Sequence, residues 1–155
     1  MSGAWIDAPC PCGGGALGSA CCGRYLASAH GELALMSLRA GDQRVARAVE
    51  GDGAPTAEAL MRSRYTAFAV LDAAYLLATW HASTRPVELE LDPGMVWKRL
   101  LIQDTVAGGA ADASGVVEFT AVYQDEDGRG RQTERSNFTR EGGRWFYVDG
   151  QLGGA

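Results

Sequence analysis

Residues 116–140 have the sequence VVEFTAVYQDEDGRGRQTERSNFTR, in which apolar and polar side chains alternate on both sides of a central turn. In the first half, a strand would place on one face Val117, Phe119, Ala121 and Tyr123. In the second half, the same period groups Glu134, Ser136, Phe138 and Arg140. The intervening DEDGRG, at 125–130, is typical of a turn. The stretch therefore predicts a β-hairpin with one face turned to the core.

The strand pattern continues on both sides of this hairpin. RLLIQDTVAG at residues 99–108 and GRWFYVDG at residues 143–150 are also rich in β-forming residues, and REGG at residues 140–143 supplies another turn. We therefore expect the β-rich runs to form one curved antiparallel sheet.

Helical spacing precedes the sheet, in APTAEALMRSRYTAFAVLDAAYLLATWHASTRP at residues 54–86. Thr56 suits the N-cap of a first helix, and Asp72 suits the N-cap of a second helix from Ala73 to Trp80. Two helices followed by an antiparallel sheet predict the α+β class.

All four cysteines of the chain fall within CPCGGGALGSACCG, at residues 10–23. Cys10 and Cys12 form a C-x-C pair, and Cys21 and Cys22 are adjacent. A glycine-rich turn lets four thiolates converge on one metal ion in a closed tetrahedral site, for which zinc is the first choice and iron is also compatible. Two alternatives stay open, namely disulfides, which a reducing compartment disfavours, and four free thiols.

Composition limits the classes of function. The 155 residues carry a formal charge of −5 and are 46% hydrophobic, as in a folded globular protein. Such a chain lacks the broad basic surface that holds DNA by counterion release. The N-terminus has no signal-peptide pattern, and no stretch is long and apolar enough to span a membrane. We expect a cytoplasmic protein that binds neither DNA nor membranes.

The cysteine arrangement resembles the SEC-C motif, the zinc-binding module at the C-terminus of the SecA translocation ATPase, and this resemblance implies that the four cysteines are the zinc ligands. The helices and strands resemble the nuclear transport factor 2-like (NTF2-like) fold, also called SnoaL-like or cystatin-like, in which a curved sheet and helices form a cone with a mouth. Together with APTAEALMRSRYTAF, VEFTAVY and RWFYVDG, the cysteine motif is similar to the YchJ-like family of small bacterial proteins.

The family resemblance also divides the chain. It implies a zinc knuckle over residues 1–26 and an NTF2-like domain over residues 55–152. Residues 27–54 depart from the family pattern, and we expect them to be a linker or short inserted helices.

A cone with a mouth supplies candidate pocket residues. In the wider superfamily, carboxylates, histidines and tyrosines in the mouth abstract protons. The candidates in this chain are Arg62, Tyr65, Asp72, Trp80, His81 and Glu134, together with Glu118 and Tyr123.

Each candidate also has a structural interpretation. Asp72 could cap a helix, and His81 could stabilise the end of one. The glutamates could be ion-paired on the surface, and the tyrosines could be core residues. Arg62 and Arg64 do not share a helix face, so one of them is expected inside. There it would form a buried pair with a carboxylate such as Glu134, or else mark an anion-binding pocket.

Two functions follow from these motifs. We favour a zinc-binding adaptor whose knuckle docks on a protein or ribonucleoprotein partner, because the similar SecA module contacts a chaperone. Trp5 and Tyr25 would be its exposed anchors, beside the positive charge of Arg24. The alternative is a small-molecule-binding protein, or a SnoaL-like isomerase or cyclase, although we lean against an enzyme. A homodimer formed through the sheet is also compatible with the sequence.

Overall fold

The computed structural model describes residues 4–26 and 53–153. The predicted linker or inserted helices lie outside the described residues, except for the last two positions. The N-terminal part contains three short 3-10 turns, η1 (Ala4–Asp7), η2 (Gly18–Ala20) and η3 (Cys22–Arg24). Within the two described ranges, no helix is long and apolar enough to cross a bilayer.

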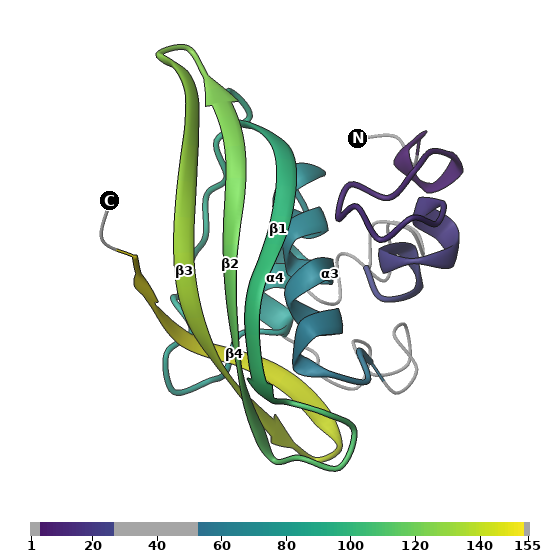
Figure 1. Ribbon diagram of the computed structural model, residues 1–155, viewed down its shortest axis with the longest axis vertical. Coiled ribbons are helices and arrows are strands. Elements are labelled where there is room, and N and C mark those ends of the chain that lie inside the picture. The colour runs from purple at the N-terminus through teal and green to yellow at the C-terminus, as the bar shows by residue number, and fades with distance from the viewer. Residues whose placement is uncertain (1–3, 27–52, 154–155) are drawn as a thin grey trace.

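The strands form one antiparallel sheet, which is long and curved (Figure 1). They pair in chain order as β1 (Val96–Ala107), β2 (Ser114–Asp125), β3 (Gly128–Glu141) and β4 (Arg144–Leu152). In the β2–β3 hairpin, Phe119 lies opposite Glu134 and Val117 lies opposite Ser136. The faces predicted separately for the two strands therefore coincide in the sheet.

Two helices lie on one side of this sheet, α3 (Ala57–Ala69) and α4 (Ala73–Ala78). Helix α3 contacts β1, β2 and β4, whereas α4 packs on α3. The N-terminal cysteine segment (residues 4–26) lies on the side of α3 away from the strands (Figure 1). The predicted α+β class is therefore confirmed, and α3 contacts both the sheet and the cysteine segment.

Both predicted helix caps are present. Thr56 Oγ1 accepts a hydrogen bond from the Ala59 N–H at 3.0 Å, and the Asp72 carboxylate accepts one from the Tyr75 N–H at 3.0 Å. Each side chain satisfies an N–H that has no partner within its own helix. Helix α4 ends at its sixth residue and thus stops before the expected Trp80.

The core lies between α3 and the inner face of the sheet. Val117 and Phe138 on the strands are buried, as is Leu60 on the helix. One polar contact inside this core joins the hydroxyl groups of Ser63 and Tyr75 at 2.7 Å. Hydrogen bonding of this kind offsets the cost of burying the two hydroxyl groups.

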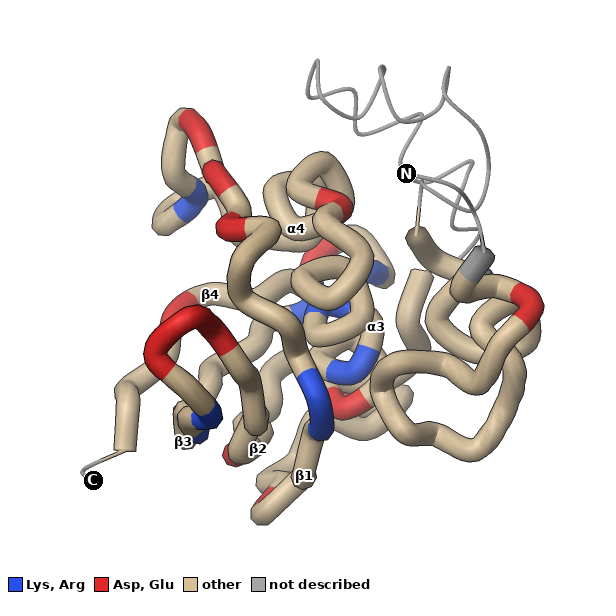
Figure 2. Tube along the Cα trace, turned by 90° about the horizontal axis from the view of Figure 1, so that it is seen from above, with Lys and Arg blue, Asp and Glu red and all other residues tan. Residues whose placement is uncertain are grey.

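Charged residues are distributed unevenly over the described surface. Figure 2 shows acidic residues gathered at the β2–β3 turn, which contains Asp125, Glu126 and Asp127. The basic residues drawn in the same view are scattered over several elements.

Candidate metal centre and ligand cavity

The sulfur atoms of Cys10, Cys12, Cys21 and Cys22 all lie within 4.8 Å of one another. The Cys12 and Cys21 sulfurs are 3.6 Å apart, and none of the four cysteines forms a disulfide. A tetrahedral ion with metal–sulfur bonds of about 2.3 Å requires sulfurs about 3.8 Å apart. The four side chains therefore fit a single metal ion with only small adjustments.

Glycine makes this convergence sterically accessible. Gly13 and Gly15 have φ angles of +77° and +92°, in the left-handed region that other residues rarely adopt. Between them, a Cβ at Gly14 would lie 3.2 Å from the Cys21 sulfur and 3.3 Å from the Cys12 sulfur. The loop therefore needs glycine both for its backbone conformation and for the space beside the sulfurs.

Hydrogen bonds among the thiols shift their pKa values in opposite directions. Hydrogen bonds from Cys12 and Cys22 lower the pKa of the Cys10 thiol. The same contacts with Cys10 raise the pKa of Cys12 to about 11 and also raise the pKa of Cys22. A thiolate at Cys10 thus opposes deprotonation of Cys12 and Cys22 unless a cation compensates its charge. A divalent metal ion would supply that compensation, since metal binding displaces thiol protons.

The cysteine cluster is attached to α3. The Cys10 sulfur lies 3.6 Å from Thr66 Oγ1, and Arg62 Nη1 donates a hydrogen bond to the Cys12 carbonyl at 3.1 Å. Arg62 Nε also forms an ion pair with Glu58 at 3.0 Å. The prediction that Arg62 lines a pocket is therefore wrong, because the rotation of α3 turns this side chain towards the cysteine segment.

The aromatic residues of the N-terminal segment are packed rather than free. Tyr25 is only 7% exposed, and Trp5 is partly buried against the core. A Cβ at Gly18 would lie 2.4 Å from the Trp5 carbonyl oxygen, so Gly18 allows this close packing. The expectation that Tyr25 is an exposed anchor is therefore wrong. Arg24 is exposed, and its Nε donates a hydrogen bond to the Cys21 carbonyl at 2.9 Å.

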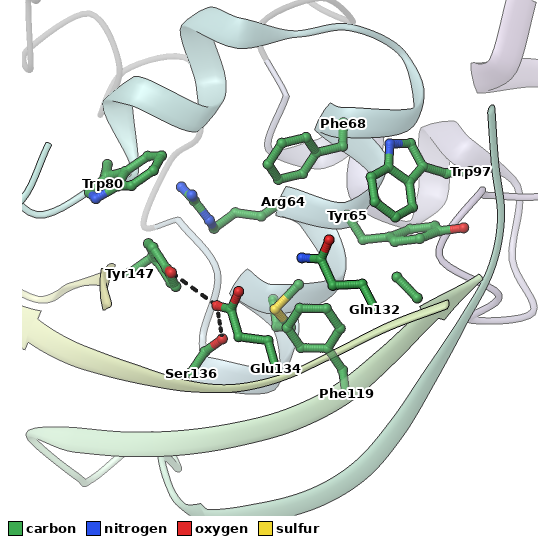
Figure 3. Close-up of a pocket in the computed structure, with 12 residues that line it drawn as sticks. Arg64, Tyr65, Phe68, Trp80, Trp97, Phe119, Gln132, Glu134, Ser136 and Tyr147 are labelled. Carbon is green, nitrogen blue, oxygen red and sulfur yellow. Dashed lines mark hydrogen bonds between the residues drawn. The ribbon is translucent and has the colours of Figure 1, made fainter. Parts of the chain in front are cut away.

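A cavity of about 230 Å³ lies between α3 and the inner face of the sheet (Figure 3). Three predicted pocket residues, Tyr65, Trp80 and Glu134, line it. Its lining also includes Arg64, one of the two arginines of which one was expected inside, together with Met61, Phe68, Trp97, Phe119, Ala121, Gln132, Ser136 and Tyr147. Four of these residues lie on β2 and β3, where the alternation of side chains along each strand could have predicted that they face inward.

Arg64 is the charged residue that α3 turns inward. It is 3% exposed, and its Nη1 donates hydrogen bonds to the Leu76 carbonyl at 2.8 Å and to Thr79 Oγ1 at 2.7 Å. Its guanidinium carbon lies 5.2 Å from the Trp80 ring and 4.6 Å from the Tyr147 ring, in cation–π geometry. Burial lowers the pKa of Arg64 to about 10, so the side chain remains charged at neutral pH.

Glu134 faces the same cavity from β3. Its Oε2 accepts hydrogen bonds from Ser136 Oγ at 2.7 Å and from the Tyr147 hydroxyl at 2.9 Å. Burial, and then the Glu134 charge, raise the pKa of Tyr147, which keeps that phenol a donor. Among the described residues, no ion pair joins Glu134 to Arg64. The predicted buried pair between them does not form.

Asp72 and His81 lie outside the cavity lining, contrary to their prediction as pocket residues. Asp72 is buried at the start of α4, where it serves as the N-cap. The His81 ring lies near the surface, with Nε2 2.7 Å from a Glu141 oxygen and Nδ1 2.7 Å from Ser83 Oγ. Asp72 therefore has the capping role that the sequence offered as its alternative, whereas the His81 ring contacts Ser83 and Glu141 beyond the end of α4 instead of stabilising a helix end.

The other two candidates also lie outside the cavity lining. Glu118 points to the outer face of the sheet, where Arg135 Nη1 donates to its carboxylate at 2.8 Å. The Tyr123 ring packs edge-on against Trp97, with ring centroids 5.6 Å apart. The structure therefore favours an ion-paired role for Glu118 and an aromatic packing role for Tyr123.

Replacement of Asp72 tests its role as a cap. Asp72→Ala is expected to lower the free energy of unfolding by about 1–2 kcal/mol, because the Tyr75 N–H loses its acceptor. Asp72→Asn, which keeps an acceptor oxygen, is expected to retain most of that stability. Urea denaturation of both variants is the measurement. Equal losses in the two variants would show that the charge of Asp72, rather than its capping oxygen, stabilises the helix.

Comparisons with known proteins agree with this architecture. The family described as YchJ, middle NTF2-like domain, matches residues 56–150. A UPF0225 protein of Streptomyces coelicolor is 46% identical over 144 residues, which cover 93% of this chain and 95% of that protein. A UPF0225 protein of Chromobacterium violaceum is 47% identical over 146 residues, which cover 92% of each chain.

Solved structures extend the likeness to the N-terminal segment. The solution structure of a SEC-C motif containing protein from Rhodopseudomonas palustris has 26% identity and a TM-score of 0.65, and the match covers 92% of this chain and 96% of that one. A crystal structure of a SEC-C motif containing protein from Psychrobacter arcticus shares the fold, with a TM-score of 0.65. Because the family model matches its NTF2-like domain and the UPF0225 relatives match most of its length, this chain belongs to the YchJ family of UPF0225 proteins.

Proposed function

We propose that this protein binds a small organic molecule in the cavity, which we take to be the mouth of the predicted cone. The observation that carries the proposal is Arg64, a buried guanidinium without a carboxylate partner in the described residues, which lines a cavity with aromatic walls. Concave apolar sites with a few convergent polar groups are the usual form of small-molecule sites. Binding, rather than turnover, is the activity proposed.

The cysteine cluster has a structural role in this proposal. Cys10, Cys12, Cys21 and Cys22 would hold one zinc ion, with iron as the alternative. Four thiolate ligands leave no coordination position for a substrate. The ion would neutralise the crowded thiolates and stabilise the N-terminal segment against α3. A cytoplasmic location, where thiols stay reduced, belongs to the same proposal.

A neutral aromatic probe tests the cavity. We expect titration with 3-phenylpropan-1-ol, followed by NMR, to shift the indole N–H signals of Trp80 and Trp97 saturably. A dissociation constant of about 1 mM, equivalent to about 4 kcal/mol, is expected for so small a probe. Trp145, whose indole donates to the Pro55 carbonyl outside this cavity, is the internal control. Unshifted Trp80 and Trp97 signals would overturn the proposal, as would equal shifts at Trp145.

Docking on a protein or ribonucleoprotein partner is a second candidate function. The observation that favours it is Leu17, which is 50% exposed within the cysteine segment. Affinity purification from a bacterial lysate would compare the intact chain with Leu17→Ser. A partner that co-purifies in stoichiometric amounts with the intact chain alone would support docking. Equal recovery with both chains would count against this surface.

A further inference from the structure

The two ends of the cavity differ in chemistry (Figure 3). One end carries the Arg64 guanidinium and the Glu134 carboxylate, close to Ser136 and Tyr147. The other end is walled by aromatic rings, contributed by Phe68, Trp97 and Phe119. A guest that fits both ends therefore has a polar head and one flat apolar arm.

The polar end has hydrogen-bonding capacity that the protein does not use. In the described residues, Nη1 is the only Arg64 nitrogen with acceptors, although the side chain also carries Nε–H and Nη2–H donors. Likewise, both hydrogen bonds to Glu134 go to Oε2, which leaves Oε1 as an acceptor. Arg64 Nε, Arg64 Nη2 and Glu134 Oε1 are not among the fully buried side-chain atoms that lack a hydrogen-bond partner. Each can therefore contact a guest, Arg64 as a donor and Glu134 as an acceptor.

A structural role for Arg64 accounts for only part of this arrangement. Its Nη1 binds the last turn of α4 through Leu76 and Thr79, which anchors that helix to α3. A neutral donor could make the same two hydrogen bonds without the cost of burying a charge. The hydrogen bonds to α4 do not account for the positive charge or for the remaining donors of Arg64, which lines the same cavity as Glu134.

The charges in the cavity restrict the guest. Arg64 and Glu134 together have no net charge, so a guest with a single charge would leave one charge uncompensated in a partly buried site. A guest with a carboxylate and an ammonium group would meet Arg64 with the first and Glu134 with the second. We propose, building on the function above, that the ligand is a zwitterion of the α-amino acid class with an aromatic or large apolar side chain.

The size of the cavity agrees with this class. Pockets that hold drug-sized molecules have volumes of about 300–1,000 Å³. The cavity here, at about 230 Å³, is smaller and suits a guest of about a dozen non-hydrogen atoms. Phenylalanine has that size, with its charged head and its ring at opposite ends of the molecule.

Four probes with the same phenyl arm test the ligand class by isothermal titration calorimetry. They are L-phenylalanine, 3-phenylpropanoate, 2-phenylethylamine and 3-phenylpropan-1-ol, whose head groups are zwitterionic, negatively charged, positively charged and neutral, respectively. We expect L-phenylalanine to bind at least 10-fold more tightly than either singly charged probe. Equal affinities for all four would overturn the ligand class and leave cavity binding intact. Failure of all four to bind would overturn both proposals.

Glu134→Gln separates recognition of the ligand from support of the fold. The amide keeps an acceptor for Ser136 and Tyr147 and removes the negative charge. We expect this variant to bind L-phenylalanine about 10-fold more weakly and 3-phenylpropanoate more tightly than the native chain does. Glu118→Gln, on the outer face of the sheet, is the matched control and is expected to change neither affinity. A uniform loss of affinity for all probes in Glu134→Gln would overturn the role assigned to Glu134.

Discussion

Cys12→Ser is expected to reduce bound zinc from about one ion per chain to nearly none, and to lower the melting temperature by about 10 °C. Cys12 is fully buried among the other sulfurs, so serine would leave a poor ligand at the centre of the cluster. Structural zinc contributes about 10–16 kcal/mol of apparent binding free energy in zinc-finger peptides. A loss of only about 4 kcal/mol lowers the melting temperature of a chain of this size by about 8–16 °C.

Metal analysis by mass spectrometry and thermal denaturation provide the two measurements for this variant. Ser19→Ala is the matched control, because Ser19 is exposed in the same loop and lies outside the cysteine cluster. It is expected to keep both the zinc content and the melting temperature of the native chain. Full zinc content in Cys12→Ser would contradict the four-cysteine site. Zinc loss without a change in melting temperature would contradict its structural role.

Ala121→Phe is expected to weaken binding of the phenyl probes more than 100-fold while the chain remains folded. Ala121 is 2% exposed and lines the cavity from β2, so its side chain faces the space that the probe would occupy. The substitution adds about 100 Å³ of side chain to that space. Because the new ring fills an existing cavity, we expect a change in unfolding free energy of less than about 1 kcal/mol.

The control for this substitution lies at the next position of the same strand. Val122 lies opposite Arg131 in the hairpin, and alternation places it on the outer face, so Val122→Phe introduces the same ring away from the cavity. Calorimetric titration of both variants should show lost binding in Ala121→Phe and native affinity in Val122→Phe. Native affinity in Ala121→Phe would mean that the probe binds elsewhere.

Several features of the fold follow from short-range patterns in the sequence. The hydroxyl of Thr56 and the carboxylate of Asp72 cap the helices that follow them, as predicted. Alternation in residues 116–140 placed Val117 and Phe138 correctly in the core. Such features are predictable because each depends on residues only a few positions apart, which interact through the local backbone geometry.

The clustering of the four cysteines was also predicted from the sequence, because all four lie within one glycine-rich loop. By contrast, the partners of the buried charges were assigned wrongly. Sequence spacing showed that Arg62 and Arg64 point in different directions, without showing which side of α3 would face the sheet. Glu134 was expected to pair with the inward arginine and instead binds Ser136 and Tyr147.

The patterns along the chain thus determined the order of helices and strands, their caps, the inner face of the sheet and the cysteine cluster. The cavity arises only when α3 packs on the curved sheet, and its wall combines Arg64 from the helix with Tyr147 from the last strand. The rotation of α3 about its axis depends on the fit of many side chains from distant segments at once. No local pattern encodes that fit, and it is the fit that leaves Arg64 inside and Arg62 beside the cysteines.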